Sequence, residues 1–319
     1  MQRDDLINGV REALIRSGFT VSKPLNMRSI SFDIVARRDK SLLLIKILSN
    51  VDAFSKETAD ELKILSEALA ASPLLIGERS GSGEIEEGIV YSRFSVPIIS
   101  LKTLSDLLCE NVPPFIFAAP GGLYVKLDSE LLHKIREDKN ISLGTLAEVA
   151  GVSRRTIQMY EAGMGAMIDA AIRLEEFLDA PILIPVDPLS FRPERTERPK
   201  VDIESLDPFT REIFRVLMNM GYSIRPTQRA PFEALTVDDE VLILTGLGKD
   251  ESKVVEKARV VHDISKVTGK ESVIFIERVR SKQSIGGTAL IGKDELRKID
   301  EGVKLRRLVI ERSETDEKY

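Results

Sequence analysis

The stretch from Leu146 to Gly163, LAEVAGVSRRTIQMYEAG, decides the fold of the middle of the chain. Apolar residues recur at helical spacing up to Ala150, and Gly151 follows them. A sharp turn between packed helices needs a residue that tolerates a positive φ, as glycine does. Ser153 is a suitable N-cap for a second helix with the sequence RRTIQMYE, as Ser142 is for the first. The stretch therefore predicts two short helices joined by a tight turn.

The second of these helices carries polar side chains that are suited to DNA. Arginine can make a bidentate contact to guanine, and glutamine to adenine, when a helix lies in the major groove. Hydroxyl groups near the start of a helix lie beside free N–H groups that favour phosphate. We therefore assign Arg154, Arg155 and Gln158 to base contacts, and Ser153 and Thr156 to contacts with the DNA backbone.

These residues resemble the helix-turn-helix of the Cro and lambda-repressor type. Leu-Ala, Gly-Val-Ser, a buried Ile and Tyr-Glu-x-Gly stand at matching positions, and the resemblance runs from Leu131 to about Leu183. The chain departs from the pattern at Leu143, where the family often has glutamine. It also has GMGAM at 163–167, where the family often has a polar or proline entry to the fourth helix. The resemblance implies a domain that binds double-stranded DNA.

The composition limits the other classes of protein that this chain can belong to. With a formal net charge of −5, it is unsuited to coating nucleic acid non-specifically, so any DNA contact must be local. No apolar run approaches the roughly 18 residues that cross a bilayer, and the charged N-terminus is not a signal peptide. We therefore expect a cytoplasmic protein without membrane contact. One cysteine and two histidines cannot build a zinc cluster, and no cofactor is expected.

The regions on either side of the helical segment repeat one order of elements. Each reads as a helix, three strands, a second helix and a buried strand. Phe32-Asp33 in the first region matches Phe232-Glu233 in the last, and Glu78-Arg79 matches Glu277-Arg278. Apolar central strands in this order indicate an α/β sandwich. We interpret the chain as a multidomain protein, with an all-α helix-turn-helix domain between two duplicated α/β domains of αβββαβ order.

The first α/β region resembles the restriction-endonuclease-like fold. Those enzymes hold a catalytic metal with an acid on the second strand and another acid on the third, two residues before a lysine. Asp33 matches the first acid and Lys46 the lysine, but Leu44 stands at the second acid. In the last region Glu233 matches the first acid alone. We interpret both regions as degenerate scaffolds without a metal site, predict that the protein is not an enzyme, and expect Asp33 and Lys46 to pair or to cap a strand edge.

Proline and glycine mark the joints between these regions. A Pro-Gly-Gly turn precedes the alternating strand LYVKL, and four prolines lie between 185 and 202. We expect a restriction-endonuclease-like α/β domain at 1–112, a β-hairpin connector at 113–127, the helix-turn-helix domain at 128–185, a proline-rich linker at 186–204, a second α/β domain at 205–312 and a tail at 313–319.

The full layout, with PGGLYVKLD before the helices, resembles the archaeal HTH-type transcriptional regulators. That resemblance implies transcription regulation. Our first hypothesis is a sequence-specific regulator with helix 153–161 in the major groove, which binds an inverted repeat as a homodimer and uses its α/β domains to dimerise or to sense a signal. One alternative is a metal-dependent, structure-specific nuclease that the helix-turn-helix targets to DNA. Another is a bridging cofactor that contacts the transcription machinery. A third is a helix-turn-helix that serves only packing or dimerisation.

Overall fold

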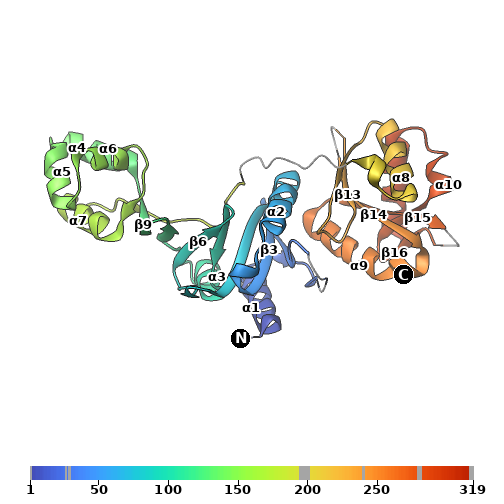
Figure 1. Ribbon diagram of the computed structural model, residues 1–319, viewed down its shortest axis with the longest axis horizontal. Helices are drawn as coiled ribbons and strands as arrows, with labels where there is room; N and C mark the ends of the chain where they lie inside the picture. Colours follow the sequence, from blue (N-terminus) through green and yellow to red (C-terminus); the bar gives the residue numbers. More distant parts are fainter. Residues whose placement is uncertain are drawn as a thin grey trace. The chain divides into compact units, whose positions relative to one another are not determined.

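The computed structural model describes residues 2–25, 27, 30–193, 202–238, 241–278 and 282–315 (Figure 1). The chain folds into two compact units and passes between them more than once. Within the described ranges, no helix is both long enough and apolar enough to cross a bilayer. Unit 1 holds Met1–Gly18, Ile47–Ser55 and Ser72–Pro193, and unit 2 holds Phe19–Lys46, Lys56–Ala71 and Glu194–Tyr319.

The α/β portion of unit 1 is built on strands with mostly buried side chains. Strand β4 pairs in parallel with β7, which pairs antiparallel with β6. Helix α1 packs on α3. Its apolar stripe of Leu6, Val10 and Leu14 is fully buried because these residues share one helix face. The elements are α1 (Arg3–Arg16), η1 (Val51–Ala53), β4 (Ser72–Ser80), β5 (Gly83–Glu84), β6 (Ile89–Arg93), β7 (Val96–Ile99) and α3 (Leu101–Cys109).

Unit 1 also contains the helical part, which we define as Ile116–Ile184. The predicted hairpin is present as the antiparallel pair β8 and β9. Strand β9 pairs further with β10 and β11, so Val125 and Leu127 belong to the same core as the helices. The elements are β8 (Ile116–Ala119), β9 (Gly122–Leu127), α4 (Ser129–Asp138), α5 (Leu143–Ala150), α6 (Arg154–Glu161), β10 (Ala166–Met167), α7 (Ile168–Leu178) and β11 (Leu183–Ile184).

The prediction that the middle domain is all-α is wrong in this respect. Strands β10 and β11 are each two residues long, which is too short for a periodic pattern. They supply hydrogen-bond partners to the backbone of β9, whose N–H and C=O groups lose water on burial. The helical part therefore combines helices with a small antiparallel sheet.

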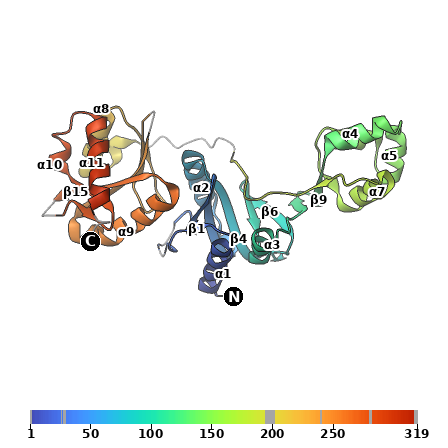
Figure 2. The same cartoon turned by 180° about the vertical axis from the view of Figure 1, so that it is seen from behind.

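Unit 2 contains a mixed sheet in the order β12-β13-β14-β15-β17-β16. Figure 2 shows β15 of this sheet together with α8, α9 and α11. Strands β14, β15 and β17 run parallel, and the outer strands pair antiparallel. Val273 and Phe275 of β15 lie in one core with α8 and α11, whereas Ile274 and Ile276 lie in another with α9. Successive side chains of a strand point to opposite faces, so helices that cover both faces require apolar residues throughout β15.

Unit 2 also contains the antiparallel strands β1 and β2 and the part of β3 up to Lys46, while the rest of β3 belongs to unit 1. Ile34 lies opposite Ile45 in the β2–β3 pair, and Ala234 lies opposite Thr245 in the β13–β14 pair. The elements are β1 (Thr20–Val21), β2 (Ile34–Arg38), β3 (Ser41–Asn50), α2 (Lys56–Leu69), η2 (Ile203–Ser205), α8 (Pro208–Asn219), β12 (Ser223–Pro226), β13 (Ala234–Val237), β14 (Leu242–Asp250), α9 (Glu251–Thr268), β15 (Glu271–Arg278), β16 (Ser284–Ile285), β17 (Thr288–Gly292), α10 (Lys293–Leu296) and α11 (Gly302–Thr315).

The predicted tail is shorter than expected. Helix α11 continues through Thr315, inside the stretch that we assigned to the tail at 313–319. Arg312 is buried in this helix, and its Nη2 lies 2.5 Å from Glu295 Oε1. This ion pair joins α11 to α10 and stabilises the last turns of α11. Residues 316–319 lie outside the described residues.

The predicted linker begins with residues that pack on unit 1. The Val186 N–H donates to the Pro114 carbonyl at 2.8 Å, and Arg192 Nη1 donates to Ser72 Oγ at 2.6 Å. Residues 194–201 of the linker lie outside the described residues. The other domain boundaries stay predictions.

Candidate nucleic-acid interface

Two capped helices and a left-handed turn form the centre of the helical part. Ser142 Oγ accepts a hydrogen bond from the Thr145 N–H at 3.0 Å, and Ser153 Oγ accepts one from the Thr156 N–H at 3.1 Å. Gly151 has φ 69°, which glycine adopts without a steric penalty. The predicted N-caps and the predicted turn are confirmed, so α5 and α6 begin and end where local chemistry places them.

The buried side of α6 sets the direction of its polar side chains. Ile157 is fully buried and Tyr160 is 3% exposed, both in the core that α4, α5 and α7 share. Residues on the opposite side of the helix must then face solvent. The exposed residues at and after the N-cap are Ser153, Arg154, Arg155, Gln158 and Met159. Sequence reasoning missed Met159, although its spacing from Arg155 is the signal that places the two on one face.

Arg154 lies against the start of α5, not along α6 alone. A Cβ atom at Gly144 would lie 3.1 Å from both Nε and Nη2 of Arg154. The guanidinium therefore rests on the first turn of α5, where glycine leaves room for it. By contrast, within the described part of the chain no hydrogen bond or ion pair engages the side chain of Arg155 or Gln158. Of the residues predicted to contact bases, Arg154 therefore lies against α5, whereas Arg155 and Gln158 lie on the exposed face of α6.

The hydroxyl groups predicted to contact phosphate are already paired. Ser153 Oγ and Thr156 Oγ1 lie 2.9 Å apart, and Ser142 Oγ and Thr145 Oγ1 repeat this arrangement at 2.9 Å on α5. Thr156 is half-buried, whereas Ser142, Thr145 and Ser153 are exposed. Sequence reasoning did not assign Ser142 or Thr145 to the interface.

Glu161 ties the end of α6 to α4. Its carboxylate accepts from Arg136 Nε at 2.5 Å and lies 3.1 Å from His133 Nδ1. Burial opposes ionisation of this carboxyl, but the hydrogen bonds from Arg136 and His133 outweigh burial and hold its pKa below the usual value. Glu161 is the acid of the Tyr-Glu-x-Gly motif, so the sequence contained a signal for it, but not for its partners on α4.

Arg173 stabilises the turn from the side of α7. Its Nη2 donates to the Ala150 carbonyl at 2.8 Å, at the end of α5, where carbonyl groups lack helical partners. The same nitrogen lies 3.3 Å from where a Cβ of Gly151 would stand. No local pattern identified Arg173, because its role depends on how α7 packs.

The nuclease-like positions of the first α/β region form a buried ion pair. Lys46 Nζ lies 3.2 Å from Asp33 Oδ1 and donates to the Ile30 carbonyl at 2.9 Å. The Asp33 side chain is fully buried, as is Leu44 at the position of the second acid. The predicted pairing of Asp33 with Lys46 is confirmed. Across the described residues, no group of three acidic, histidine or cysteine side chains is arranged to hold a metal ion.

Glu233, the acid that the sequence pattern matches to Asp33, lies directly before β13 and has a different partner. Lys257 Nζ of α9 lies 2.5 Å from Glu233 Oε1, and the Leu247 N–H donates to Oε2 at 2.7 Å. Sequence reasoning missed Lys257, because it comes from a helix and not from the strand position that Lys46 occupies.

The chain is similar to curated archaeal proteins over nearly its whole length. It is 40% identical to a protein of Methanocella arvoryzae, over 98% of this chain and 97% of the relative. It is 41% identical to one of Haloarcula marismortui and 38% identical to one of Methanosarcina acetivorans, over 99% of each chain. Each relative carries the name "Putative HTH-type transcriptional regulatory protein". The chain belongs to this family of archaeal HTH-type transcriptional regulatory proteins.

Two parts of this HTH-type regulatory protein match known domain families. The profile of the PD-(D/E)XK superfamily domain matches residues 3–114, and a helix-turn-helix profile matches residues 132–183. The resemblance of the first region to restriction-endonuclease-like folds and that of the middle region to helix-turn-helix domains are thereby confirmed. No solved structure matches this member of the family.

Proposed function

We propose that the chain is a sequence-specific regulator of transcription that reads the major groove of double-stranded DNA with α6. The observation that carries the proposal is the exposure of Arg155 and Gln158 on the face of a capped helix whose other face is buried. A helix oriented in this way presents its N-terminal side chains to base edges. The names of the relatives agree with this reading.

Phosphate contacts complete the proposed interface. Arg154 rests on the first turn of α5, from which it reaches a phosphate more readily than a base. Ser142 caps α5 and Ser153 caps α6, and the free N–H groups at the N-terminus of each helix favour a phosphate. In this proposal Ser153 and Thr156, whose hydroxyls bond each other, hold the N-terminus of α6 against the DNA backbone, while Arg155 and Gln158 supply sequence preference.

Selection of bound sequences from a random DNA pool tests this function. The wild-type chain should enrich one sequence, and the double variant Arg154→Ala/Arg155→Ala should enrich none under the same salt conditions. Enrichment of the same sequence by both proteins would contradict the assignment of α6. If the chain acts as a homodimer, the enriched site should be an inverted repeat with half-sites about 34 Å apart.

We also propose that the PD-(D/E)XK domain is a scaffold and not a nuclease. Its one matching acid, Asp33, is buried against Lys46, and a leucine replaces the second acid. One enclosed carboxylate is a poor site for Mg²⁺, which prefers several oxygen ligands. Duplex, flap and four-way DNA should stay intact with Mg²⁺ or Mn²⁺, and cutting that Asp33→Ala abolishes would overturn this proposal.

The second α/β region is, in our proposal, a diverged copy of the first, on the far side of the helix-turn-helix in the chain. The two regions support this by a shared element order and by equivalent strand registers. The Asp33 N–H donates to the Ile45 carbonyl at 2.7 Å, as the Glu233 N–H does to the Thr245 carbonyl at 2.9 Å. Each acid pairs with a lysine, which is Lys46 of β3 in the first region and Lys257 of α9 in the second.

A further inference from the structure

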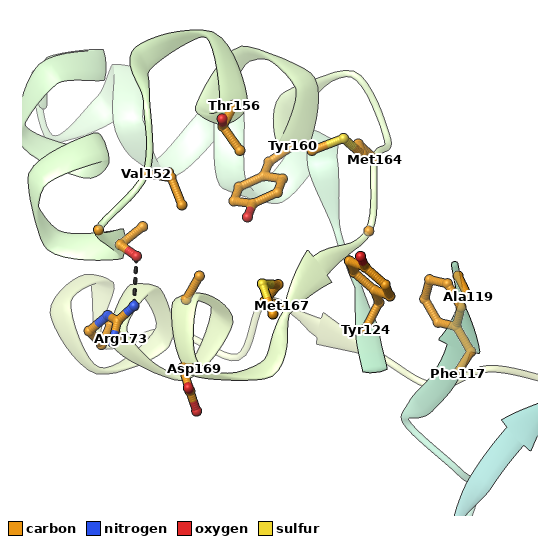
Figure 3. A pocket seen from close by; sticks show the side chains of 14 residues that line it. Phe117, Ala119, Tyr124, Val152, Thr156, Tyr160, Met164, Met167, Asp169 and Arg173 are labelled. Atoms are coloured by element: carbon orange, nitrogen blue, oxygen red, sulfur yellow. Dashed lines mark hydrogen bonds between the residues drawn. The ribbon is translucent and has the colours of Figure 1, made fainter. Parts of the chain in front are cut away.

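A cavity of about 620 Å³ lies behind the proposed reading helix, inside unit 1 (Figure 3). Strands β8 and β9 form one wall, and α6, the α5–α6 turn, the segment 164–167 with β10 and the first turns of α7 form the others. This volume falls within the range of natural small-molecule sites, which is roughly 300–1,000 Å³. The side chains that dominate its lining are Phe117, Tyr124, Val152, Tyr160, Met164 and Met167.

The lining favours an uncharged ligand with an apolar body. Aromatic, aliphatic and thioether groups cover most of the wall, and burial of such a body releases water from both surfaces. Asp169 and Arg173 lie at the cavity with opposite charges, and Arg173 is occupied by the Ala150 carbonyl. The cavity therefore favours neither a positively nor a negatively charged ligand.

Tyr160 adds one directional group. Its ring is buried in the core, and its hydroxyl points into the cavity in Figure 3. Burial raises the pKa of this phenol more than its backbone hydrogen bond with Met167 lowers it, so the hydroxyl stays protonated and can donate to a ligand oxygen. A planar or aliphatic molecule with one carbonyl or ether acceptor fits these groups.

The position of the cavity connects it to DNA reading. Thr156 and Tyr160 belong to α6, and Gly151 and Val152 form the turn before it. A ligand in this space contacts the inner side of the helix whose outer side carries Arg155 and Gln158. If it binds one arrangement of α6 more tightly than another, it shifts the population toward that arrangement.

We propose that this cavity is an effector site for a small uncharged apolar molecule with a hydrogen-bond acceptor, and that its occupancy changes the affinity of α6 for DNA. The second half of the proposal rests on the proposed function, and the first half does not. The site would place sensing within the helix-turn-helix domain itself.

Fluorescence titration of the full chain with Nile red, a neutral planar dye with a carbonyl acceptor, tests the cavity. Saturable binding is expected. Ala119→Trp, which fills the cavity from β8, should weaken it by roughly tenfold or more. The matched control is Ala118→Trp, on the same strand but not among the lining residues, which should bind as the wild type does. Equal binding by the wild type and a folded Ala119→Trp would overturn the site.

Tyr160→Phe is a second variant that keeps the ring in place. It should weaken dye binding several-fold, because it removes the hydroxyl that donates to the ligand and that also bonds the Met167 backbone. Circular dichroism establishes that each variant is folded, and if Ala119→Trp is not, unchanged binding by Tyr160→Phe overturns the site.

Affinity for the selected DNA, measured with and without dye, tests the effector role. A several-fold change is expected for the wild type and none for Ala119→Trp. If the dye binds in the cavity and leaves DNA affinity unchanged, the effector role is overturned while DNA binding stands. If no DNA sequence is selected, the proposed function fails, and the titration still decides the cavity.

Discussion

At the residue scale, α6 divides its side chains between a core and a binding surface. Ile157 and Tyr160 are buried, and Arg155 and Gln158 are exposed on the other side. The division follows from the helical repeat, since two apolar residues three positions apart fix which side faces inward. Each exposed residue can therefore be tested by substitution without disturbing the core.

Arg155→Ala should weaken the complex with the selected DNA site by about 1–3 kcal/mol and relax the preference at one base pair. The reason is the loss of a bidentate contact to a base edge. A titration against the selected site and against sites changed at single base pairs measures both effects. Unchanged affinity and preference would contradict the assignment.

Arg154→Ala is the matched comparison, because it removes the same side chain from the neighbouring position. We expect it to weaken binding to all sequences alike and to lower the slope of log affinity against log salt by about 1. A loss of preference at one base pair would show instead that Arg154 reads a base.

At the element scale, the α5–α6 turn depends on Gly151 and on Arg173. Gly151→Val should lower the free energy of unfolding by about 1–2 kcal/mol, because a residue with a Cβ is strained at φ 69°. Denaturant unfolding of the full chain measures this loss, taken from the transition in which the helix-turn-helix domain unfolds. Glu148→Val introduces the same residue at an exposed position of α5 and should cost only a few tenths of a kcal/mol. Equal losses in the two variants would argue against strain at the turn.

The contact between α4 and α6 should depend on pH through Glu161. Its pKa is lower in the folded chain than in the unfolded chain. The contact therefore contributes its full stability above the ordinary glutamate pKa of about 4.3 and loses it as pH falls through the lower, folded value. As pH is lowered across this acid range, the free energy of unfolding should fall less steeply for Glu161→Gln than for the wild type. Parallel curves would mean that Glu161 does not titrate with folding.

At the scale of the whole molecule, the nuclease-like domain contributes structure through its buried ion pair. Asp33→Ala should lower the free energy of unfolding by about 3–5 kcal/mol, because it leaves the Lys46 ammonium buried without its partner. The double variant Asp33→Leu/Lys46→Met removes both charges and should recover most of this loss. Denaturant unfolding measures both, and a stable Asp33→Ala would contradict a structural role for the pair.

Much of the helix-turn-helix could be predicted because its determinants are local. Ser142 and Ser153 cap helices by bonding N–H groups three residues away, and Gly151 supplies a backbone angle that no neighbour can supply. The pairing of Asp33 with Lys46 was within reach for a similar reason. Asp33 directly precedes β2 and Lys46 lies on β3, and a tight turn joins these two adjacent strands.

The rest depends on contacts between residues that are far apart in the chain. Strands β10 and β11 exist because β9 needs backbone partners, and Arg173 reaches the end of α5 only after α7 has packed. Lys257 meets Glu233 across 24 positions. No local pattern reports such partners, because they are chosen by packing and by the need to satisfy buried polar groups.

The sequence by itself determined where α5 and α6 begin and end, which side of α6 is polar and which family pattern the middle of the chain follows. Those properties arise from backbone angles, caps and helical spacing over a few residues. Only the tertiary structure decided that Arg154 rests on α5, that Asp33 is enclosed and that a cavity lies behind the reading helix. These properties belong to surfaces brought together by folding, so no single segment contains them.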